Sequence, residues 1–437
     1  MAWYVSGLLM LLSILILMGI GLPIAFTFMA VSLFGAYVFM GGMFGLEQVV
    51  ANASTAVSSF SLVPIPLFLL MGELFFHTGL AMRIFKSIDV LIGNMRGRLA
   101  YLSVISGTIF AMLSGSSMAN TALLGGLLVP EMERQGYNRR IAIGPILGAG
   151  GLAMIIPPSA LAVLLGSLAK IDIGALLIAG IVPGIVLAAS YIAVIFAKIK
   201  FDPDCVPDVA PTSHSVKEKF QAIFLSLLPV SLIIMAVLGS LLGGFATPSE
   251  AAAIGAIAVF LLALSLGLVT LRVIAKSLIA TVKVSAMILM IIVASSTFSQ
   301  ILAFSGISAN VVNGTVSILD GQIAMMLGML VVMVLLGMFM DQISMMLITI
   351  PIFIPIANTL GFDMVWFGII MLLSLEVSLL TPPFGLALFV MLGVAPSGTT
   401  LREIIAASLP YTACIFALIA LVIVWPELAT ALPGLMM

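Results

Sequence analysis

The sequence predicts an all-α, polytopic membrane protein built from two inverted-topology repeats. Three observations support this fold class: charge is scarce, proline positions recur along the chain, and basic residues are unevenly placed. Of the 437 residues, 63% are hydrophobic and 8% are charged, whereas about a quarter of the residues of a soluble domain carry charge. The chain therefore has too little polar surface for a soluble fold. Its formal net charge of −1, without a basic patch, also excludes nucleic acid as a partner.

Long charge-free stretches predict the membrane spans, because a spanning helix needs about 20 apolar residues. The first basic residue is Arg83, so the apolar N-terminal run lacks the basic start of a signal peptide and is interpreted as a span. The spans expected in the first half lie near 3–20, 22–40, 58–80, 141–169 and 173–197. Residues 198–219 are rich in proline and charge, and we interpret them as a cytoplasmic linker between a first repeat (1–197) and a second repeat (220–437).

Proline positions indicate that the two halves are related. A shift of 225 residues aligns 130–158 with 355–383 without a gap, and both segments end in a proline pair, Pro157-Pro158 and Pro382-Pro383. An internal repeat of about 200 residues is therefore expected.

Basic residues predict the relative orientation of the repeats. They cluster near 83–98 and 134–140, whereas the equivalent second-half segments near 306–322 and 358–364 have none, and Arg272, Lys276 and Lys283 have no basic counterpart in 41–58. Because basic loops are cytoplasmic, equivalent loops lie on opposite sides and the repeats are inverted. Both termini are then periplasmic, and Lys170 is the one basic residue that this topology places on the periplasmic side.

The same rule predicts a re-entrant helical hairpin in each repeat. Residues 99–133 lie between two cytoplasmic loops, so they enter and leave on one side, around the small, polar sequence LSGSSMAN (113–120). The equivalent hairpin covers about 322–357 and contains MFMDQISMM (338–346). Irregular backbone at membrane depth is tolerated where it lines a cavity or is buried in protein, so we expect both hairpins to face a site.

Each proline pair predicts a discontinuous helix, over about 141–169 and about 365–393. Proline lacks an N–H donor and clashes with the carbonyl one turn earlier, so GAGGLAMIIPPS (148–159) and LEVSLLTPPFG (375–385) should break and leave carbonyl oxygens unpaired. Such oxygens, with nearby hydroxyl and amide oxygens, suit a desolvated Na⁺ at a transport site. The alternative is a simple kink in a packed helix.

Ionisable residues inside the membrane are further candidates for function. Asp341 has two interpretations, a direct role with ion or substrate and a structural hydrogen bond to the hairpin backbone. Glu73 and Glu250 are interpreted as capping or packing groups near helix ends, and Glu376 as a residue that caps or stabilises a broken helix. The two cysteines are too few for a Cys-based metal site, and the methionines of 325–346 are interpreted as packing groups, so no transition metal is expected.

These motifs resemble the large membrane subunit of TRAP transporters, the DctM-like family of the ion transporter superfamily. The resemblance covers nearly the whole chain and rests on FLLMGE (68–73), SGSSMANT (114–121), GGLAMIIPPS (150–159), GMFMDQISMMLITIPIFIPI (337–356) and TPPFG (381–385). It implies an elevator-type secondary transporter of the bacterial inner membrane, not an enzyme, which imports organic acids with Na⁺ as the coupling ion and no other cofactor. The implied partners are a small membrane subunit of about four helices, expected as a separate polypeptide, a soluble periplasmic substrate-binding protein, the organic anion and membrane lipid.

The resemblance also implies two sets of site residues. The sodium-binding residues are Ser114, Ser116, Ser117, Asn120, Gly150, Gly151, Met154, Pro157, Asp341, Ser344, Ser378, Thr381 and Pro382. The substrate-binding residues are Ser116, Asn120, Ser159 and Thr381.

Alternative functions differ in the residues they require. A membrane hydrolase needs a catalytic pair, and Asp341 has no apparent intramembrane Asp partner. A channel does not need inverted hairpins with paired breaks. The nearest alternative is a proton-coupled organic-anion symporter that acts without a binding protein. The acid itself stays open among C4-dicarboxylates, sialic acids and other carboxylates.

Overall fold

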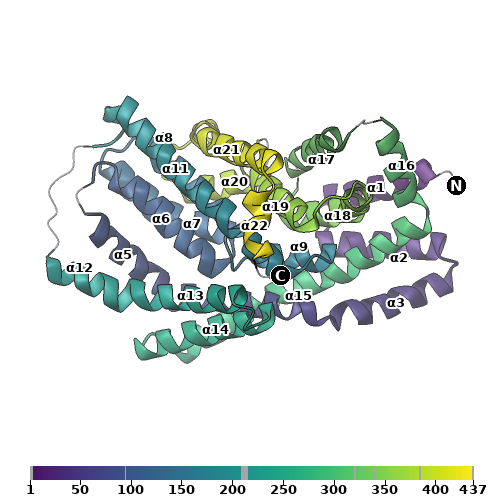
Figure 1. The fold of residues 1–437 in the computed structure, drawn as a ribbon, viewed down its shortest axis with the longest axis horizontal. Coiled ribbons are helices and arrows are strands. Elements are labelled where there is room, and N and C mark those ends of the chain that lie inside the picture. The colour runs from purple at the N-terminus through teal and green to yellow at the C-terminus, as the bar shows by residue number, and fades with distance from the viewer. Residues whose placement is uncertain are drawn as a thin grey trace.

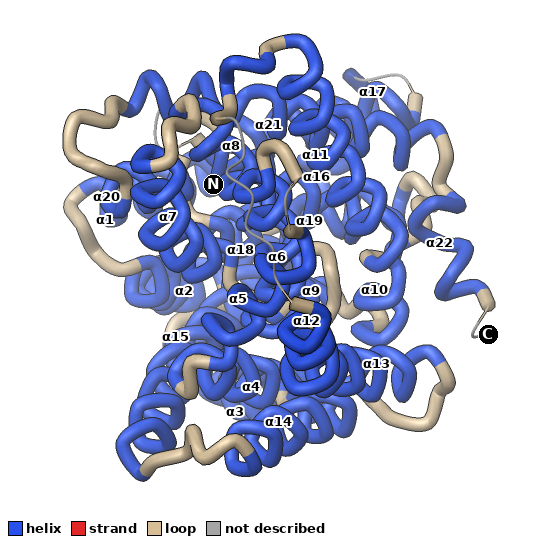
Figure 2. Tube along the Cα trace, turned by 90° about the vertical axis from the view of Figure 1, so that its left-hand side faces the viewer, coloured by secondary structure: helices blue, strands red, loops and turns tan. Residues whose placement is uncertain are grey.

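The fold is entirely helical over the part of the chain that the structure describes. The computed structural model describes residues 3–93, 95–207, 215–318, 321–338, 340–382 and 385–435, and every regular element in these ranges is a helix (Figures 1 and 2). This confirms the all-α prediction. The second proline of the second pair, Pro383, lies outside the described residues.

Seven helical stretches of the described chain are long and apolar enough to cross a membrane, which confirms a multi-span protein. They are Phe60–His77, Ile173–Phe201, Val216–Leu242, Pro248–Ser265, Leu271–Phe304, Gln342–Thr359 and Leu401–Val424.

Within the described residues, the first half contains eleven α-helices. In chain order they are α1 (Trp3–Gly19), α2 (Ile24–Phe39), α3 (Met43–Val57), α4 (Pro64–His77), α5 (Leu80–Ile92), α6 (Arg98–Ser114), α7 (Ser117–Arg134), α8 (Arg139–Gly151), α9 (Ala160–Ala169), α10 (Ile173–Ala179) and α11 (Ile181–Phe201). Short 3₁₀ turns are η1 (Phe60–Leu62), η2 (Leu152–Met154) and η3 (Pro203–Cys205).

The second half contains eleven more. They are α12 (Val216–Ala222), α13 (Leu228–Leu242), α14 (Pro248–Ser265), α15 (Leu271–Phe304), α16 (Ile307–Ile318), α17 (Gln322–Gly337), α18 (Gln342–Thr359), α19 (Met364–Leu380), α20 (Leu386–Val394), α21 (Leu401–Val424) and α22 (Glu427–Gly434). The π-helical turn η4 (Ile223–Leu227) joins α12 to α13.

Local sequence signals explain where several helices begin. Thr247 and Glu250 form a capping box at the start of α14, and Pro248 occupies the first turn, where its missing N–H costs nothing. Glu250 is therefore a capping group, as predicted. Glu73 lies in the last turns of α4, with a carboxylate oxygen 3.2 Å from His77 Nδ1.

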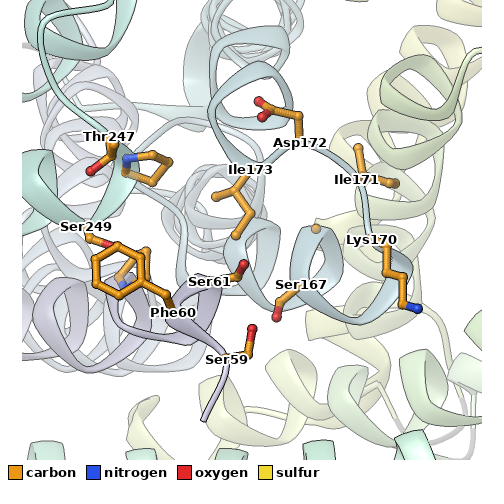
Figure 3. Close-up of a pocket in the computed structure, with 13 residues that line it drawn as sticks. Ser59, Phe60, Ser61, Ser167, Lys170, Ile171, Asp172, Ile173, Thr247 and Ser249 are labelled. Atoms are coloured by element: carbon orange, nitrogen blue, oxygen red, sulfur yellow. The ribbon is translucent and has the colours of Figure 1, made fainter. Parts of the chain in front are cut away.

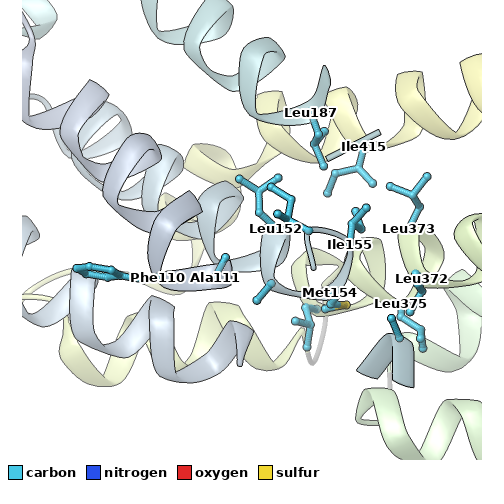
Figure 4. Close-up of a cluster of buried hydrophobic side chains, with 14 of the residues drawn as sticks. Phe110, Ala111, Leu152, Met154, Ile155, Leu187, Leu372, Leu373, Leu375 and Ile415 are labelled. Carbon is cyan, nitrogen blue, oxygen red and sulfur yellow. The ribbon is translucent and has the colours of Figure 1, made fainter. Parts of the chain in front are cut away.

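The helices form an elongated arrangement with the broken helices near its centre. In Figure 1, α5–α8 lie towards one end, α1–α3 and α16 lie towards the other, and α9, α18 and α19 lie between them. α4 packs on α14 and α15, and α15 also packs on α2 and α3. Figure 4 shows Leu152, Met154 and Ile155 of the first break near side chains of α11, α19 and α21. All three side chains are buried, so the break lies in the hydrophobic core.

Four segments that the topology argument treats as loops are largely helical. They are 41–58, 83–98, 272–283 and 306–322, which contain α3, most of α5, part of α15 and α16. The physical reason is visible in α5, where Leu80, Ala81, Ile84 and Ile88 are buried on one face while the basic side chains project elsewhere. An amphipathic helix at a membrane surface satisfies its own backbone groups. The basic residues therefore mark helix faces rather than irregular loops.

Helix boundaries recur along the chain at the offset that aligns the prolines. α8 begins at Arg139 and α19 at Met364, and α7 begins at Ser117 and α18 at Gln342, so each pair differs by 225 residues. The inverted orientation of the two halves stays a prediction.

Candidate functional site

The turn of the first hairpin lies against the break of the first broken helix. α6 ends at Ser114, Gly115 takes a left-handed conformation (φ 59°), and Ser116 caps α7 by accepting a hydrogen bond from the Ala119 N–H at 3.3 Å. A Cβ on Gly115 would lie 3.3 Å from the nitrogen of Ala160, the first residue of α9. A side chain at position 115 would therefore crowd the start of α9, so this turn packs closely on that helix.

The break itself replaces helical hydrogen bonds with side-chain bonds. After η2, residues 155–159 are not helical, and Pro157 and Pro158 have no N–H to donate. The Ser159 hydroxyl donates to the Met154 carbonyl at 2.8 Å and accepts from the Ala162 N–H at 3.2 Å, so it caps α9 from a fully buried position.

Three oxygen atoms on one face of α7 are buried without a partner. Ser117, Asn120 and Thr121 are three and four residues apart, so their side chains share a helix face. The Ser117 hydroxyl, the Asn120 amide oxygen and the Thr121 hydroxyl have no hydrogen-bond partner among the described residues. Leaving one such atom unpaired costs about 1–3 kcal/mol. Three such oxygens on one helix face make this face a candidate binding site.

The same face of α7 contacts the end of α8. The Asn120 amide nitrogen donates to the carbonyls of Gly107 at 2.9 Å and Ala149 at 3.3 Å, which fixes its unpaired oxygen. A Cβ on Gly150 would lie 2.2 Å from the Thr121 hydroxyl oxygen. Glycine at this position therefore brings the α8 backbone directly against the unpaired oxygens.

The second hairpin turn is capped by Asp341. Its Oδ2 accepts from the N–H groups of Ile343 at 3.1 Å and Ser344 at 3.2 Å, and its Oδ1 accepts from the Ser344 hydroxyl. Hydrogen bonds to the hairpin backbone are what the structural interpretation of Asp341 predicts. Asp341 and Ser116 are 225 residues apart, and both are N-caps of the second helix of a hairpin.

The second hairpin packs on the end of α19. A Cβ on Gly337 would lie 2.0 Å from the Cβ of Ser378. The hydroxyls of Ser378 and Thr381 each donate, at 2.6 Å, to carbonyls of their own helix, Leu375 and Val377 respectively. Pro382 follows directly at the end of α19.

Two contacts join the residues of the first hairpin and first break to those of the second hairpin and α19. The Gln342 amide nitrogen, in the first turn of α18, lies 3.1 Å from the Met154 sulfur in the first break. A Cβ on Gly151 would lie 2.1 Å from Oε1 of Glu376 in α19. Glu376 is fully buried, and its Oε1 accepts from the Tyr191 hydroxyl at 3.2 Å. Glu376 lies within α19 and caps no helix end, and its Oε2 is buried without a hydrogen-bond partner among the described residues.

The structure thus brings the predicted residues into two adjoining groups, whose role in binding stays a prediction. Residues of the first hairpin and first break contact each other, and residues of the second hairpin contact the end of α19. Sequence reasoning missed Thr121, although the quoted motif contains it four residues after Ser117. It also missed Gln342 and Tyr191, for which the sequence offers no signal because both act through contacts between distant segments.

The donor set has the chemistry of a site for a hard cation. It consists of hydroxyl, amide and carbonyl oxygens, which suit hard cations, whereas transition metals prefer imidazole and thiolate. Within the described ranges, no three or more His, Cys, Asp or Glu residues gather as a metal site.

Similar proteins are membrane components of one transporter class. The family described as "Tripartite ATP-independent periplasmic transporter, DctM component" matches residues 11–428. The C4-dicarboxylate TRAP transporter large permease protein DctM of Pseudomonas aeruginosa is 33% identical over 86% of each chain. The sialic acid TRAP transporter large permease protein SiaM of Vibrio cholerae is 28% identical over 95% of each chain.

A solved transporter shares the fold. The crystal structure of the Alcanivorax borkumensis YdaH transporter superposes with a TM-score of 0.62 at 16% identity, over 89% of this chain and 90% of that one. Since the family match spans nearly the whole chain, this protein is a component of a transporter and not an enzyme. The chain belongs to the DctM family, the large permease subunit of the tripartite ATP-independent periplasmic transporters.

Proposed function

We propose that this chain is the subunit that carries an organic acid across the bacterial inner membrane, coupled to Na⁺ that binds beside the first hairpin. The observation that carries the proposal is the set of unpaired buried oxygens of Ser117, Asn120 and Thr121 against the end of α8. An ion that accepts those lone pairs would remove the cost of leaving them unsatisfied.

Helix ends around the first break favour a cation next to an anion. The carboxyl ends of α6 and α8 are negative dipole ends, which favour Na⁺. The amino ends of α7 and α9, capped by Ser116 and Ser159, present positive dipole ends, which favour a carboxylate. Bound Na⁺ would offset part of the cost of moving the carboxylate out of water.

The second hairpin supplies a second proposed ion site. Asp341 and Ser344 lie in its turn, and Gly337 brings the turn against Ser378 and the end of α19. No Lys or Arg lies in the segments that form the two hairpin turns and breaks. The acid is therefore proposed to be held by hydroxyls, backbone amides and bound Na⁺, with selectivity supplied mainly by a periplasmic binding protein.

Transport is proposed to follow an elevator movement of inverted repeats. Hairpins and broken helices pack on one another, and α2–α4 pack with α13–α15 in a group that would serve as the scaffold. Each Na⁺ that moves inward gains about 2.3 kcal/mol per 100 mV of membrane potential and about 1.4 kcal/mol per tenfold gradient. Two Na⁺ would then suffice to drive a monoanion or dianion uphill.

The names of the relatives support partners and a range of substrates. They are large permease proteins for C4-dicarboxylate and for sialic acid, so an organic acid is the proposed cargo. The proposed partners are a small membrane subunit and a soluble periplasmic binding protein.

Uptake into proteoliposomes tests this function. The membrane subunits would be reconstituted with the binding protein outside, and Na⁺ and pH gradients would be imposed separately. An inward Na⁺ gradient alone should drive uptake of the acid that the binding protein binds, and removing Na⁺ should abolish it. Uptake driven by a pH gradient without Na⁺ would show that transport is coupled to protons and not to Na⁺. Specific, high-affinity uptake without the binding protein would contradict the proposed division of roles.

A further inference from the structure

A cavity of about 660 Å³ lies apart from both hairpin turns. Its walls come from the segment before α4 with the start of that helix, from the end of α9 with the turn into α10, and from the start of α14 (Figure 3). α9 begins at the break and ends at Ala169 beside the cavity. Because a helix rises 1.5 Å per residue, its ten residues place the cavity about 15 Å from the break.

The cavity walls carry hydroxyl groups that are free to bind a ligand. Ser59, Ser61, Ser167 and Ser249 line it, and none of their hydroxyls forms a hydrogen bond to another described residue. By contrast, Ser190 in the middle of α11 donates to a carbonyl of its own helix. Figure 3 shows the hydroxyls of Ser59, Ser61 and Ser167 gathered in one part of the cavity.

One cation lies in the wall of the cavity. Lys170 is exposed and has no ion pair within the described part of the chain. Asp172 lies two residues further on, where one of its oxygens accepts from the Ala175 N–H at 2.6 Å and caps α10. The cavity thus combines an unpaired ammonium with several hydroxyls and one acidic acceptor.

Lys170 ends α9 in a backbone conformation that usually requires glycine. Lys170 has φ 55° and ψ 36°, and it is the one described residue other than glycine with positive φ. This is the position after a helix where glycine is usual, because glycine has no Cβ to clash. A lysine here is unfavourable for the backbone, which points to a use for its side chain.

We propose that this cavity binds the carboxylate of a hydroxylated organic acid on the periplasmic side, before the acid reaches the hairpins. The Lys170 ammonium would pair with the carboxylate, the serine hydroxyls would donate to it, and Asp172 would accept from a ligand hydroxyl. The identity of the ligand as cargo, and the periplasmic side, rest on the proposed function and topology. The site adds a first binding step that lies about 15 Å from the Na⁺ residues.

Protection of Lys170 from acetylation tests binding directly. Right-side-out membrane vesicles holding the complete transporter would be treated with a membrane-impermeant N-hydroxysulfosuccinimide acetate, in potassium salts without Na⁺. Peptide mass spectrometry would give the acetylation rate of each lysine. Potassium gluconate should slow acetylation of Lys170 by about tenfold, as expected for a charge-assisted contact. Sorbitol, which has the hydroxyls without the carboxylate, and butyrate, which has the carboxylate without the hydroxyls, should protect less.

Variants of Lys170 separate the effect of its side chain on uptake from any effect on folding. Lys170→Gly removes the ammonium while relaxing the backbone, so it should fold at least as well as the natural chain. It should raise the KM for uptake about tenfold with little change in kcat or in Na⁺ dependence. Lys170→Arg should keep the natural KM. Lys217→Met, at an exposed lysine in the first turn of α12, is the matched control and should change neither quantity.

Four results would overturn the proposal. Three of them are equal acetylation of Lys170 with gluconate and sorbitol, no labelling of Lys170 from outside, and an unchanged KM in Lys170→Gly. Protection by the binding protein without acid would also reject it and assign Lys170 to docking. Since the labelling needs neither Na⁺ nor transport, a failure of Na⁺ coupling would leave this result unaffected.

Discussion

Three polar side chains at the first hairpin lower the stability of the protein when nothing is bound to them. Ser117, Asn120 and Thr121 keep oxygens buried and unpaired, although a small apolar group in each place would avoid that cost. Under the proposed function, a bound ion would supply the missing partner and remove this cost. Removing one of these oxygens should therefore raise the stability of the protein without Na⁺ and reduce the stabilisation that Na⁺ gives.

Thr121→Val should raise the thermal stability of the protein without Na⁺ and remove most of the stabilisation that Na⁺ gives. Valine has the shape of threonine without the unpaired oxygen, and the oxygen is worth about 1–3 kcal/mol in either direction. Thermal unfolding followed across a Na⁺ titration, with choline as the balancing cation, measures both effects. Thr121→Ser is the control and should keep the Na⁺ response. If Thr121→Val showed the natural Na⁺ response, Thr121 would not belong to the site.

At the scale of helices, the second helix of each hairpin is N-capped by a side chain, but the capping residues differ. Ser116 caps α7 and Asp341 caps α18, but only Asp341 brings a negative charge. Its capping bonds are consistent with a structural role, and its charge is consistent with an ion site. A substitution that keeps the cap and removes the charge distinguishes the two.

Asp341→Asn should leave stability nearly unchanged and weaken Na⁺-dependent uptake about tenfold or more. Asn caps helices about as well as Asp, whereas Asp341→Ala loses the cap as well, at a cost of about 1 kcal/mol. Thermal unfolding and the Na⁺ dependence of uptake, measured on both variants, give the comparison. Natural Na⁺ affinity in Asp341→Asn would restrict Asp341 to capping α18.

At the scale of the whole molecule, the predicted inversion of the repeats would place equivalent positions on opposite sides of the membrane. Arg134 and Thr359 are 225 residues apart, and both are exposed at the ends of equivalent helices, α7 and α18. The distribution of basic residues predicts that Arg134 is cytoplasmic and Thr359 periplasmic.

Cysteines at these two positions should therefore react with an impermeant maleimide from opposite sides. Arg134→Cys and Thr359→Cys would be made in a chain whose two natural cysteines, Cys205 and Cys414, are replaced by serine. In right-side-out vesicles only Thr359→Cys should react, and in inverted vesicles only Arg134→Cys. Labelling of both cysteines from one side would show that the repeats are parallel.

Much of the helical architecture could be predicted because the membrane restricts which residues a spanning segment can contain. Scarcity of charge predicts the spans, and proline pairs predict breaks such as 155–159, since a proline cannot donate the helical hydrogen bond wherever it occurs. Helices α3, α5 and α16 were not expected, because charge in an amphipathic helix resembles charge in a loop when only sidedness is considered. Contacts between distant segments, such as Gln342 with Met154, depend on packing that no local pattern encodes.

The contact between Gly151 and Glu376 also constrains how such a chain can arise. These residues are 225 positions apart, so in the predicted repeat they are equivalent positions, yet Gly151 is packed directly on Glu376. A gene duplication that had just joined two identical halves would place two copies of one residue here. Two glutamates would put two buried carboxylates together, and two glycines would leave a void. The present pairing requires the halves to differ at this position, so neither half can be restored to the sequence of the other by a single substitution there.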